Sequence, residues 1–248
     1  MIGIISALEE ELKRFKDKAS VEQVIRQAGI DFHIAELSGQ KVVLLHSGVG
    51  KVNAAVAAQV LIDRFGVNSV ILSGLAGGVV PYLNAGDIVV TNLVAQYDIN
   101  PNAFGRRPDA IPDLARLIEA DPRLVRAAVD GFEETVKKRT HNRQLVVGTI
   151  ATGDTLVTDP AGIRWLQREF GAIAADMEGG AIGQVCQNNR IPFVVIRVIS
   201  DIADQKAAPE FVMPLDEASE LSYIIVDRML RILAESAPTT DAVSVLSN

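Results

Sequence analysis

Short apolar runs alternate with amphipathic stretches along almost the whole chain of 248 residues. A continuous apolar run of about four to eight residues is typical of a strand buried on both faces. The stretches between these runs place apolar residues every three or four positions, which is typical of a helix with one buried face. The alternation therefore predicts an α/β protein in which helices pack on a mostly buried sheet.

The same pattern gives approximate bounds for each element. We expect strands at residues 2–6, 24–27, 31–37, 41–46, 69–72, 86–94, 145–151, 173–176 and 192–199. We expect helices at residues 9–15, 51–65, 123–137, 160–170, 179–188 and 216–234. Gly29 and Gly39 lie in short turns between the second, third and fourth strands, which predicts an antiparallel meander. Asp159 followed by Pro160 is typical of a helix N-cap and the first helical position.

Length and composition favour one domain. A chain of 248 residues fits one large domain or two small ones at about 150 residues per domain, but no linker interrupts the pattern. We therefore expect a single domain over residues 1–236, followed by a disordered tail at residues 237–248. Hydrophobic residues make up 48% of the chain and charged residues 22%, which is the composition of a globular protein with a sizeable core.

Charge and cysteine content argue against several classes of function. Acidic residues outnumber basic ones by 31 to 24, and the resulting charge of −7 opposes binding to nucleic acid. Cys186 is the only cysteine, so no intramolecular disulfide can form, and the three scattered histidines do not complete a usual zinc site. These features predict a protein of the reducing cytoplasm without a bound metal. The apolar stretch at residues 2–7 is too short for a signal peptide, and no run reaches transmembrane length.

Candidate catalytic groups gather where predicted strands end, which is where open α/β sheets bind their ligands. The acidic cluster at residues 9–11, Glu178 and Asp201 each follow a predicted strand. Each has a simple structural interpretation, since acidic residues are favoured in the first helical turn and at N-caps. Three carboxylates at three strand ends, with Arg197 and Ser200 beside one of them, nevertheless favour a catalytic site.

The segment at residues 44–53 contains a strand, the pattern G-x-G and a helix, and so superficially resembles a dinucleotide-binding turn. Asn53 occupies the place of the third glycine, however, and Lys51 is followed by Val52, which excludes a Walker loop. We interpret the segment as a tight strand-to-helix turn whose amides line a site. Cys186 lies in an apolar helical stretch, where a packing role is favoured over a nucleophile.

Seven short segments, taken together, resemble one known family more specifically than any one of them does. They are residues 2–11 (IGIISALEEE), 47–55 (SGVGKVNAA), 76–78 (AGG), 103–105 (AFG), 152–154 (TGD), 176–178 (DME) and 197–204 (RVISDIAD). In this order they resemble the 5′-methylthioadenosine/S-adenosylhomocysteine nucleosidase family. The resemblance implies a three-layer αβα sandwich with a central mixed sheet, the nucleoside phosphorylase-like fold. It also implies a homodimer that hydrolyses the N-ribosidic bond of methylthioadenosine, adenosylhomocysteine or a related purine nucleoside without metal or cofactor, releasing adenine.

The resemblance also implies two catalytic roles. Glu11 corresponds to the base that activates the attacking water, and Asp201 to the acid that protonates N7 of the leaving adenine. Physical chemistry requires the same pair, because cleavage passes through an oxocarbenium-like state in which the leaving base needs a proton and the water needs a base on the opposite face. For Asp201 to donate near neutral pH, its pKa must be raised.

Binding roles follow from the same positions. Glu178 and Met177 correspond to residues that hold the ribose, and Arg197 and Ser200 to residues that orient the neighbouring carboxylates. The remaining positions surround the substrate: Leu156 and Val157 at the adenine, Leu8, Val49 and Phe211 at the ribose and 5′ substituent, and Phe104 and Pro112 from the second subunit.

Two positions depart from the family pattern. Leu75 replaces a small hydroxyl residue, and Leu156 replaces an aromatic ring, which predicts base stacking weaker by roughly 0.5 to 1.5 kcal/mol.

Three other functions stay open. A purine nucleoside phosphorylase is less favoured, because the position before the turn at Gly74 is apolar where related phosphorylases carry an arginine. A futalosine-type nucleosidase is the second alternative. A non-catalytic nucleoside-binding protein is the third, and the retained carboxylates argue against it.

Overall fold

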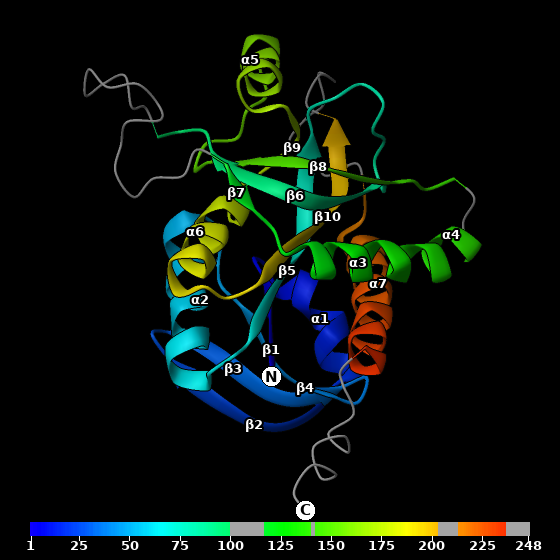
Figure 1. Cartoon of the computed structure of the whole chain (residues 1–248). Helices are drawn as coiled ribbons and strands as arrows, with labels where there is room; N and C mark the ends of the chain where they lie inside the picture. The colour runs from blue at the N-terminus through cyan, green and yellow to red at the C-terminus, as the bar shows by residue number, and fades with distance from the viewer. Residues whose placement is uncertain (100–116, 140–141, 203–212, 237–248) are drawn as a thin grey trace, which may run out of the picture.

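A mixed sheet of ten strands forms the centre of the computed structural model, which describes residues 1–99, 117–139, 142–202 and 213–236 (Figure 1). Within these residues the strands are β1 (Ile2–Ser6), β2 (Ser20–Gln27), β3 (Ile30–Leu37), β4 (Gln40–His46), β5 (Ser69–Gly78), β6 (Ile88–Gln96), β7 (Ile118–Glu119), β8 (Leu145–Thr152), β9 (Ala172–Asp176) and β10 (Phe193–Ile202).

Two groups of parallel strands make up most of the sheet. Strands β4, β1, β5 and β10 run side by side in one direction, and β6, β8 and β9 run parallel to one another. The groups meet in antiparallel fashion where β10 pairs with β6 and where β5 pairs with β9. Because β5 pairs with both β9 and β10, this half of the sheet closes on itself. At the other end, β2 and β3 form the predicted antiparallel meander with β4.

Helices cover both faces of the sheet, which confirms the predicted αβα layering. Helices α2 (Lys51–Phe65) and α6 (Gly179–Asn189) lie together on one face, while α1 (Glu9–Lys18), α3 (Pro122–Glu134) and α7 (Leu215–Glu235) lie on the other (Figure 1). The short α4 (Val136–Arg139) follows α3, and α5 (Pro160–Phe170) stands beside β8 and β9 at the top of the view.

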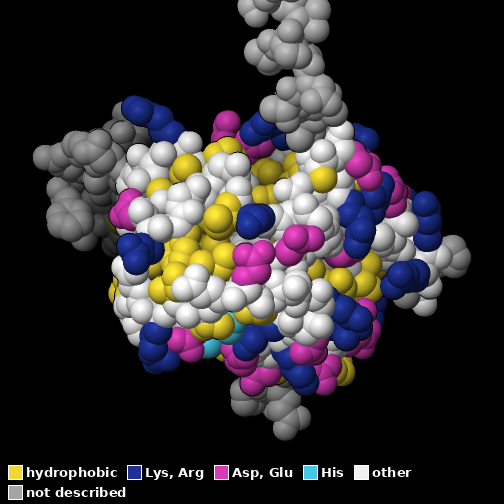
Figure 2. Space-filling model, turned by 90° about the horizontal axis from the view of Figure 1, so that it is seen from below, with side chains coloured by type: hydrophobic (Ala, Val, Ile, Leu, Met, Phe, Trp, Pro, Cys, Tyr) yellow, Lys and Arg dark blue, Asp and Glu magenta, His cyan; other side chains and the backbone are white. Residues whose placement is uncertain are grey.

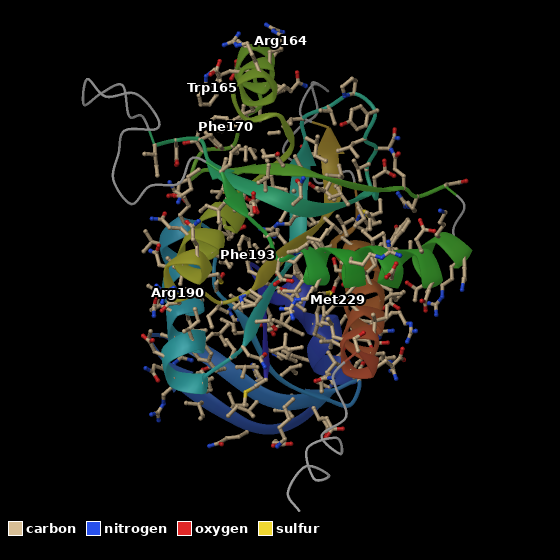
Figure 3. The ribbon with its side chains drawn as sticks, viewed as in Figure 1. Arg164, Trp165, Phe170, Arg190, Phe193 and Met229 are labelled. Carbon is tan, nitrogen blue, oxygen red and sulfur yellow. The ribbon has the colours of Figure 1, made fainter. Side chains whose placement is uncertain are left out.

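The two layers of helices bury separate apolar clusters against the sheet. Phe193 belongs to the cluster under α2 and α6, and Met229 of α7 belongs to the cluster on the opposite face (Figure 3). Complete burial of such a side chain stabilises the fold by about 1.5 to 3 kcal/mol. Gly3 of β1 allows α2 to approach closely, because a Cβ atom there would lie 2.8 Å from Leu61 Cδ1. Small residues and branched aliphatic residues thus set the spacing between the layers.

Long-range pairing extends two strands beyond their predicted ends. The strands predicted to end at residues 72 and 199 continue to Gly78 and Ile202, because β5 and β10 pair with each other over this stretch. Strand β5 also gains β9 as a neighbour at Gly77 and Gly78. The local sequence around these glycines suggests a loop, and the pairing overrides that preference.

The structure also differs from the predicted elements in the segment from β7 to α4. The helix predicted at residues 123–137 ends at Glu134, and Thr135 separates it from α4, with the Thr135 hydroxyl donating back to the Gly131 carbonyl. The two-residue strand β7 was not predicted, and it pairs with β6. The predicted tail at residues 237–248 lies outside the described residues.

The surface carries charges of both signs. On the face shown in Figure 2, Lys, Arg, Asp and Glu side chains are interspersed around an area of hydrophobic side chains, without a large basic patch. Among the described residues, no helix combines the length and the apolar character needed to cross a membrane.

Candidate active site

Glu11 is held inside the protein at the start of α1. Its side chain turns back toward the end of β1, where Oε2 accepts hydrogen bonds from the N–H groups of Ala7 at 2.9 Å and Leu8 at 3.0 Å. Oε1 accepts a third from the N–H of Leu75 in β5, at 2.8 Å. Glu11 is only 5% exposed. The backbone therefore fixes the carboxylate and leaves it some acceptor capacity, since a carboxylate offers about four lone-pair positions.

Arg197 lies at the centre of a buried group of charges. It is completely buried in β10, where its Nε and Nη2 donate to Asp176 Oδ2 at 3.0 and 2.6 Å. Nη2 also donates to Glu178 Oε2 at 2.9 Å. Its Nη1 has no hydrogen-bond partner within the described residues. A Cβ atom on Gly74 would lie 2.5 Å from this Nη1 and 2.6 Å from Glu11 Oε1, so the glycine lets both groups reach the same place over β5.

Mutual electrostatics set the charge states in this group. Burial lowers the pKa of Arg197, but Asp176, Glu178 and Glu11 raise it by more, so the guanidinium stays charged. Burial raises the pKa of Glu178, and the charges of Asp176 and Glu11 raise it further. Arg197 and the N–H of Gly50 lower it, but the balance is a raised pKa. Arg197 is thus the main influence that favours the ionised form of Glu178.

Asp176 is the member of this group that our sequence reasoning missed as a site residue. It ends β9, and it accepts hydrogen bonds from the Thr152 hydroxyl at 2.5 Å and from the Gly179 N–H at 3.0 Å, besides those from Arg197. A signal was available, because residues 176–178 and 152–154 were among the segments that carry the family resemblance. What the sequence did not reveal is that Asp176 and Arg197, which lie in different strands, form the closer of the two ion pairs of Arg197.

The turn before α2 reaches Glu178 from the opposite side. Gly48 and Gly50 have φ angles of 84° and 97°, which residues with a Cβ rarely adopt. This conformation directs the Gly50 N–H to Glu178 Oε1 at 2.9 Å. Glu178 therefore links α2 to the buried charges around Arg197.

Asp201 is carried by the last part of β10. A bulge between Ile199 and Asp201 shifts the register, so that Asp201 pairs with Gly77 of β5. Its Oδ1 accepts from the Ser200 hydroxyl at 2.5 Å and lies 3.8 Å from where a Cβ atom on Gly77 would be. The simple interpretation of Asp201 as a helix N-cap is wrong, because the residue lies within a strand. Bulges re-aim side chains in this way near active sites.

The other predicted site residues are less enclosed in the single chain. Leu8, Met177 and Val157 are half-buried, while Val49 and Leu156 are 47% and 69% exposed. The predicted residues Phe104, Pro112 and Phe211 lie outside the described residues. In the described part of the chain, no group of three or more His, Cys, Asp or Glu side chains is arranged to hold a metal ion.

Comparison with known proteins places this geometry in a family. Residues 1–231 match the model of the phosphorylase superfamily. The 5′-methylthioadenosine/S-adenosylhomocysteine nucleosidase of Geobacillus sp. (strain WCH70) is 39% identical over 226 residues, which cover 91% of this chain and 95% of that protein. The chain belongs to the phosphorylase superfamily and, within it, to these nucleosidases. The predicted family is thereby confirmed.

Solved structures of similar proteins agree with the family. The nucleosidase of Colwellia psychrerythraea 34H, solved in complex with adenine, has a TM-score of 0.84 and 38% identity, covering 92% of this chain and 93% of that one. A futalosine hydrolase of Helicobacter pylori also has a TM-score of 0.84, at 30% identity, covering 92% of this chain and 96% of that one. The nucleosidase fold is therefore confirmed, while related enzymes with this fold differ in the nucleoside that they cleave.

Proposed function

We propose that the chain hydrolyses the N-ribosidic bond of 5′-methylthioadenosine, S-adenosylhomocysteine or a related purine nucleoside and releases adenine. The observation that carries this proposal is the placement of two carboxylates along β5, Glu11 at Gly74 and Asp201 at Gly77. Three residues of a strand span about 10 Å, so the two carboxylates are offset along β5 and can serve two different atoms of one substrate. A Cβ atom at Gly74 would collide with Glu11 and Arg197, whereas one at Gly77 would only contact Asp201.

Glu11 serves as the general base in this proposal. Its Oε1 and the unpaired Arg197 Nη1 approach the same place beside Gly74. A water molecule there would donate to the carboxylate and accept from the guanidinium, which positions it for attack and gives its proton an acceptor. The three backbone donors to Glu11 restrict the carboxylate to one orientation, so little reorganisation is needed during the reaction.

Asp201 serves as the general acid at the other end of the substrate. The Ser200 hydroxyl donates to Oδ1, which leaves Oδ2 as the oxygen that would deliver a proton to N7 of the leaving base. The Ser200 hydroxyl oxygen also lies 3.3 Å from the Ala76 carbonyl oxygen of β5, and this contact helps to hold the Ser200 rotamer. We therefore assign Ser200 to the orientation of Asp201.

Glu178 holds the ribose in this scheme, next to Met177. Among the described residues, its two oxygens each accept one hydrogen bond, from Gly50 and from Arg197, so lone pairs remain for ribose hydroxyls. Leu156 and Val157 contact the base, and Leu8, Val49 and Phe211 surround the ribose and the 5′ substituent. These five residues are assigned from the family resemblance.

A homodimer with shared sites belongs to the same proposal. Val52 and Val56, four residues apart on α2, form an exposed apolar stripe that Val49 extends in the turn before the helix, and Val52 is 74% exposed in the single chain. An exposed apolar stripe beside the site supports a subunit contact there. Phe104 and Pro112 would then enter the site from the second subunit. Light scattering tests this association, and a monomer with full activity would reject shared sites.

Phosphorolysis is not favoured by the charges near the site. Arg197 is engaged by two carboxylates, and Lys51 Nζ pairs with Asp98 Oδ1 at 2.5 Å. Carboxylates of the chain therefore already balance the charge of each of these two cations. The alternative of a futalosine-type nucleosidase keeps support from the similarity to the Helicobacter pylori enzyme.

The deciding experiment is incubation with methylthioadenosine in the presence and absence of inorganic phosphate. We expect adenine and a free reducing sugar at equal rates in both reactions. Accumulation of a ribose 1-phosphate, or release that requires phosphate, would contradict hydrolysis. A parallel assay with futalosine tests the alternative substrate, since a higher kcat/KM for futalosine would assign the chain to that reaction.

A further inference from the structure

Carboxylates from two distant segments hold the N-terminus of α2. Gly50 precedes the helix and offers no side-chain cap. Its N–H donates to Glu178 Oε1 at 2.9 Å, and the N–H of Lys51 donates to Asp154 Oδ1 at 2.8 Å. Because Glu178 is the proposed ribose ligand, Asp154 shares one helix end with the ribose site.

A third carboxylate joins Asp154 to the side chain of Lys51. Asp98 Oδ1 accepts from Lys51 Nζ at 2.5 Å, and Asp98 Oδ2 accepts from the N–H of Asp154 at 3.0 Å. With the bond from the Lys51 N–H, these contacts form a closed ring of three residues, which we call the Asp98 bridge. The side chains of Lys51 and Asp98 are 18% and 25% exposed, so their ion pair is partly shielded from water.

Tyr97 holds residues 152–155, the segment that contains Asp154, from another side. Its phenol donates to the Thr155 carbonyl, and its N–H donates to the Thr152 carbonyl at 2.9 Å. A Cβ atom on Gly153 would lie 2.4 Å from the Tyr97 ring, so the ring packs directly on this backbone. Burial and the charge of Asp98 raise the pKa of Tyr97, which keeps the phenol protonated as a donor. Residues 153–155 therefore cannot move without breaking these contacts.

Leu156 and Val157, which contact the base in the proposed function, come directly after residues 153–155. Leu156 is 69% exposed and Val157 is half-buried, so packing does little to fix Leu156. Asp159 anchors the downstream side by capping α5. The upstream side is anchored by Tyr97 and the Asp98 bridge.

We propose that the Asp98 bridge positions residues 156–157 relative to the ribose ligand Glu178 and thereby sets the affinity for the purine base. Lys51, Asp98 and Asp154 are positioning residues in this role. The inference rests on the proposed function, in which residues 156–157 contact the base. In this role the bridge affects the affinity for the purine and not the acid–base catalysis by Glu11 and Asp201.

The test compares adenine binding, measured by calorimetry, with steady-state kinetics on methylthioadenosine. For Asp154→Ala we expect the adenine Kd and the KM to rise about tenfold, with kcat changed by less than about threefold. Asp98→Asn and Lys51→Met each break a partly shielded ion pair, so we expect a rise of about threefold. Lys51→Arg keeps the cation and should restore most of the affinity.

Trp165 provides a second readout. It is the only tryptophan of the chain, it lies on α5 near Phe170 (Figure 3), and its ring meets Tyr97 edge-on with centroids 6.2 Å apart. A change at the Asp98 bridge should therefore alter its fluorescence emission. Asp130→Asn and Lys137→Met are matched controls, because they break exposed ion pairs of the same kind on α3 and α4, and we expect no change in affinity or emission.

The outcomes separate this inference from the proposed function. Wild-type protein that neither binds adenine nor cleaves methylthioadenosine would overturn the proposed function. Active wild-type protein whose Asp98 and Asp154 variants keep normal adenine affinity and normal Trp165 emission would overturn the Asp98 bridge alone. A loss of thermal stability and kcat without a change in KM would also overturn it, because that result indicates a purely structural role.

Discussion

Removal of Arg197 should destabilise the protein in a way that depends on pH. Arg197→Met keeps a side chain of similar length but leaves Asp176 and Glu178 buried without their cation. Breaking a buried ion pair by deleting one partner costs about 3 to 5 kcal/mol. For a chain of this size, that corresponds to a decrease in Tm of roughly 6 to 20 °C near neutral pH.

The sign of the pH dependence follows from Glu178. Burial raises its pKa, and Arg197 is the largest influence that lowers it, so the variant should have an even higher pKa at this carboxyl. The folded variant then binds a proton more tightly than the unfolded chain does. Stability from this protonation is fully present below the unfolded pKa and is lost as pH rises through the folded pKa. We therefore expect the loss caused by Arg197→Met to be smaller at pH 5 than at pH 8.

Urea unfolding at both pH values, at one fixed protein concentration, measures this effect. Arg168→Met is a matched control, because Arg168 pairs with Glu169 while its side chain is 71% exposed, and we expect a change below about 1 kcal/mol. An equal loss at both pH values for Arg197→Met, or a loss no larger than the control, would refute the reasoning. If Arg197→Met does not fold, Arg197→Lys retains the charge with fewer donors and should show the same pH trend at smaller amplitude.

Three other predictions concern catalysis, reactivity and specificity. Glu11→Gln and Asp201→Asn should each lower kcat by about 10² to 10⁴-fold while calorimetry still detects nucleoside binding, and full activity in either variant would show that the catalytic carboxylates are misassigned. Burial raises the pKa of Cys186 to about 12, so its thiol should resist iodoacetamide at pH 8 until denaturant is added; rapid alkylation of the native protein, detected by mass spectrometry, would contradict this. In kcat/KM assays, methylthioadenosine should exceed adenosine by about tenfold, since one apolar group leaves water, and AMP should be poorest, because a 5′-phosphate would lack a partner in an apolar pocket; a ranking with AMP first would overturn the pocket.

Local features of the chain could be predicted where neighbouring residues alone decide the structure. The cap at Asp159 is confirmed, since its Oδ1 accepts from the N–H groups of Ala161 and Gly162 at 3.1 and 2.8 Å, with Pro160 at the first helical position. The meander of β2, β3 and β4 is confirmed for the same reason, because short turns with glycine join adjacent strands. The acidic cluster at residues 9–11 follows the first strand, and the family resemblance selected Glu11 from it.

By itself, then, the sequence determined the order of the main strands and helices and the local caps and turns, because these depend on contacts between residues close in the chain, while the family resemblance selected the catalytic carboxylates. Only the tertiary structure decided that β5 continues through its glycines to meet β9, and that Asp176 becomes the main partner of Arg197. Such pairings join residues far apart in sequence. Their free energy comes from burial and from charges that are brought together only when the sheet closes, so no local pattern encodes them.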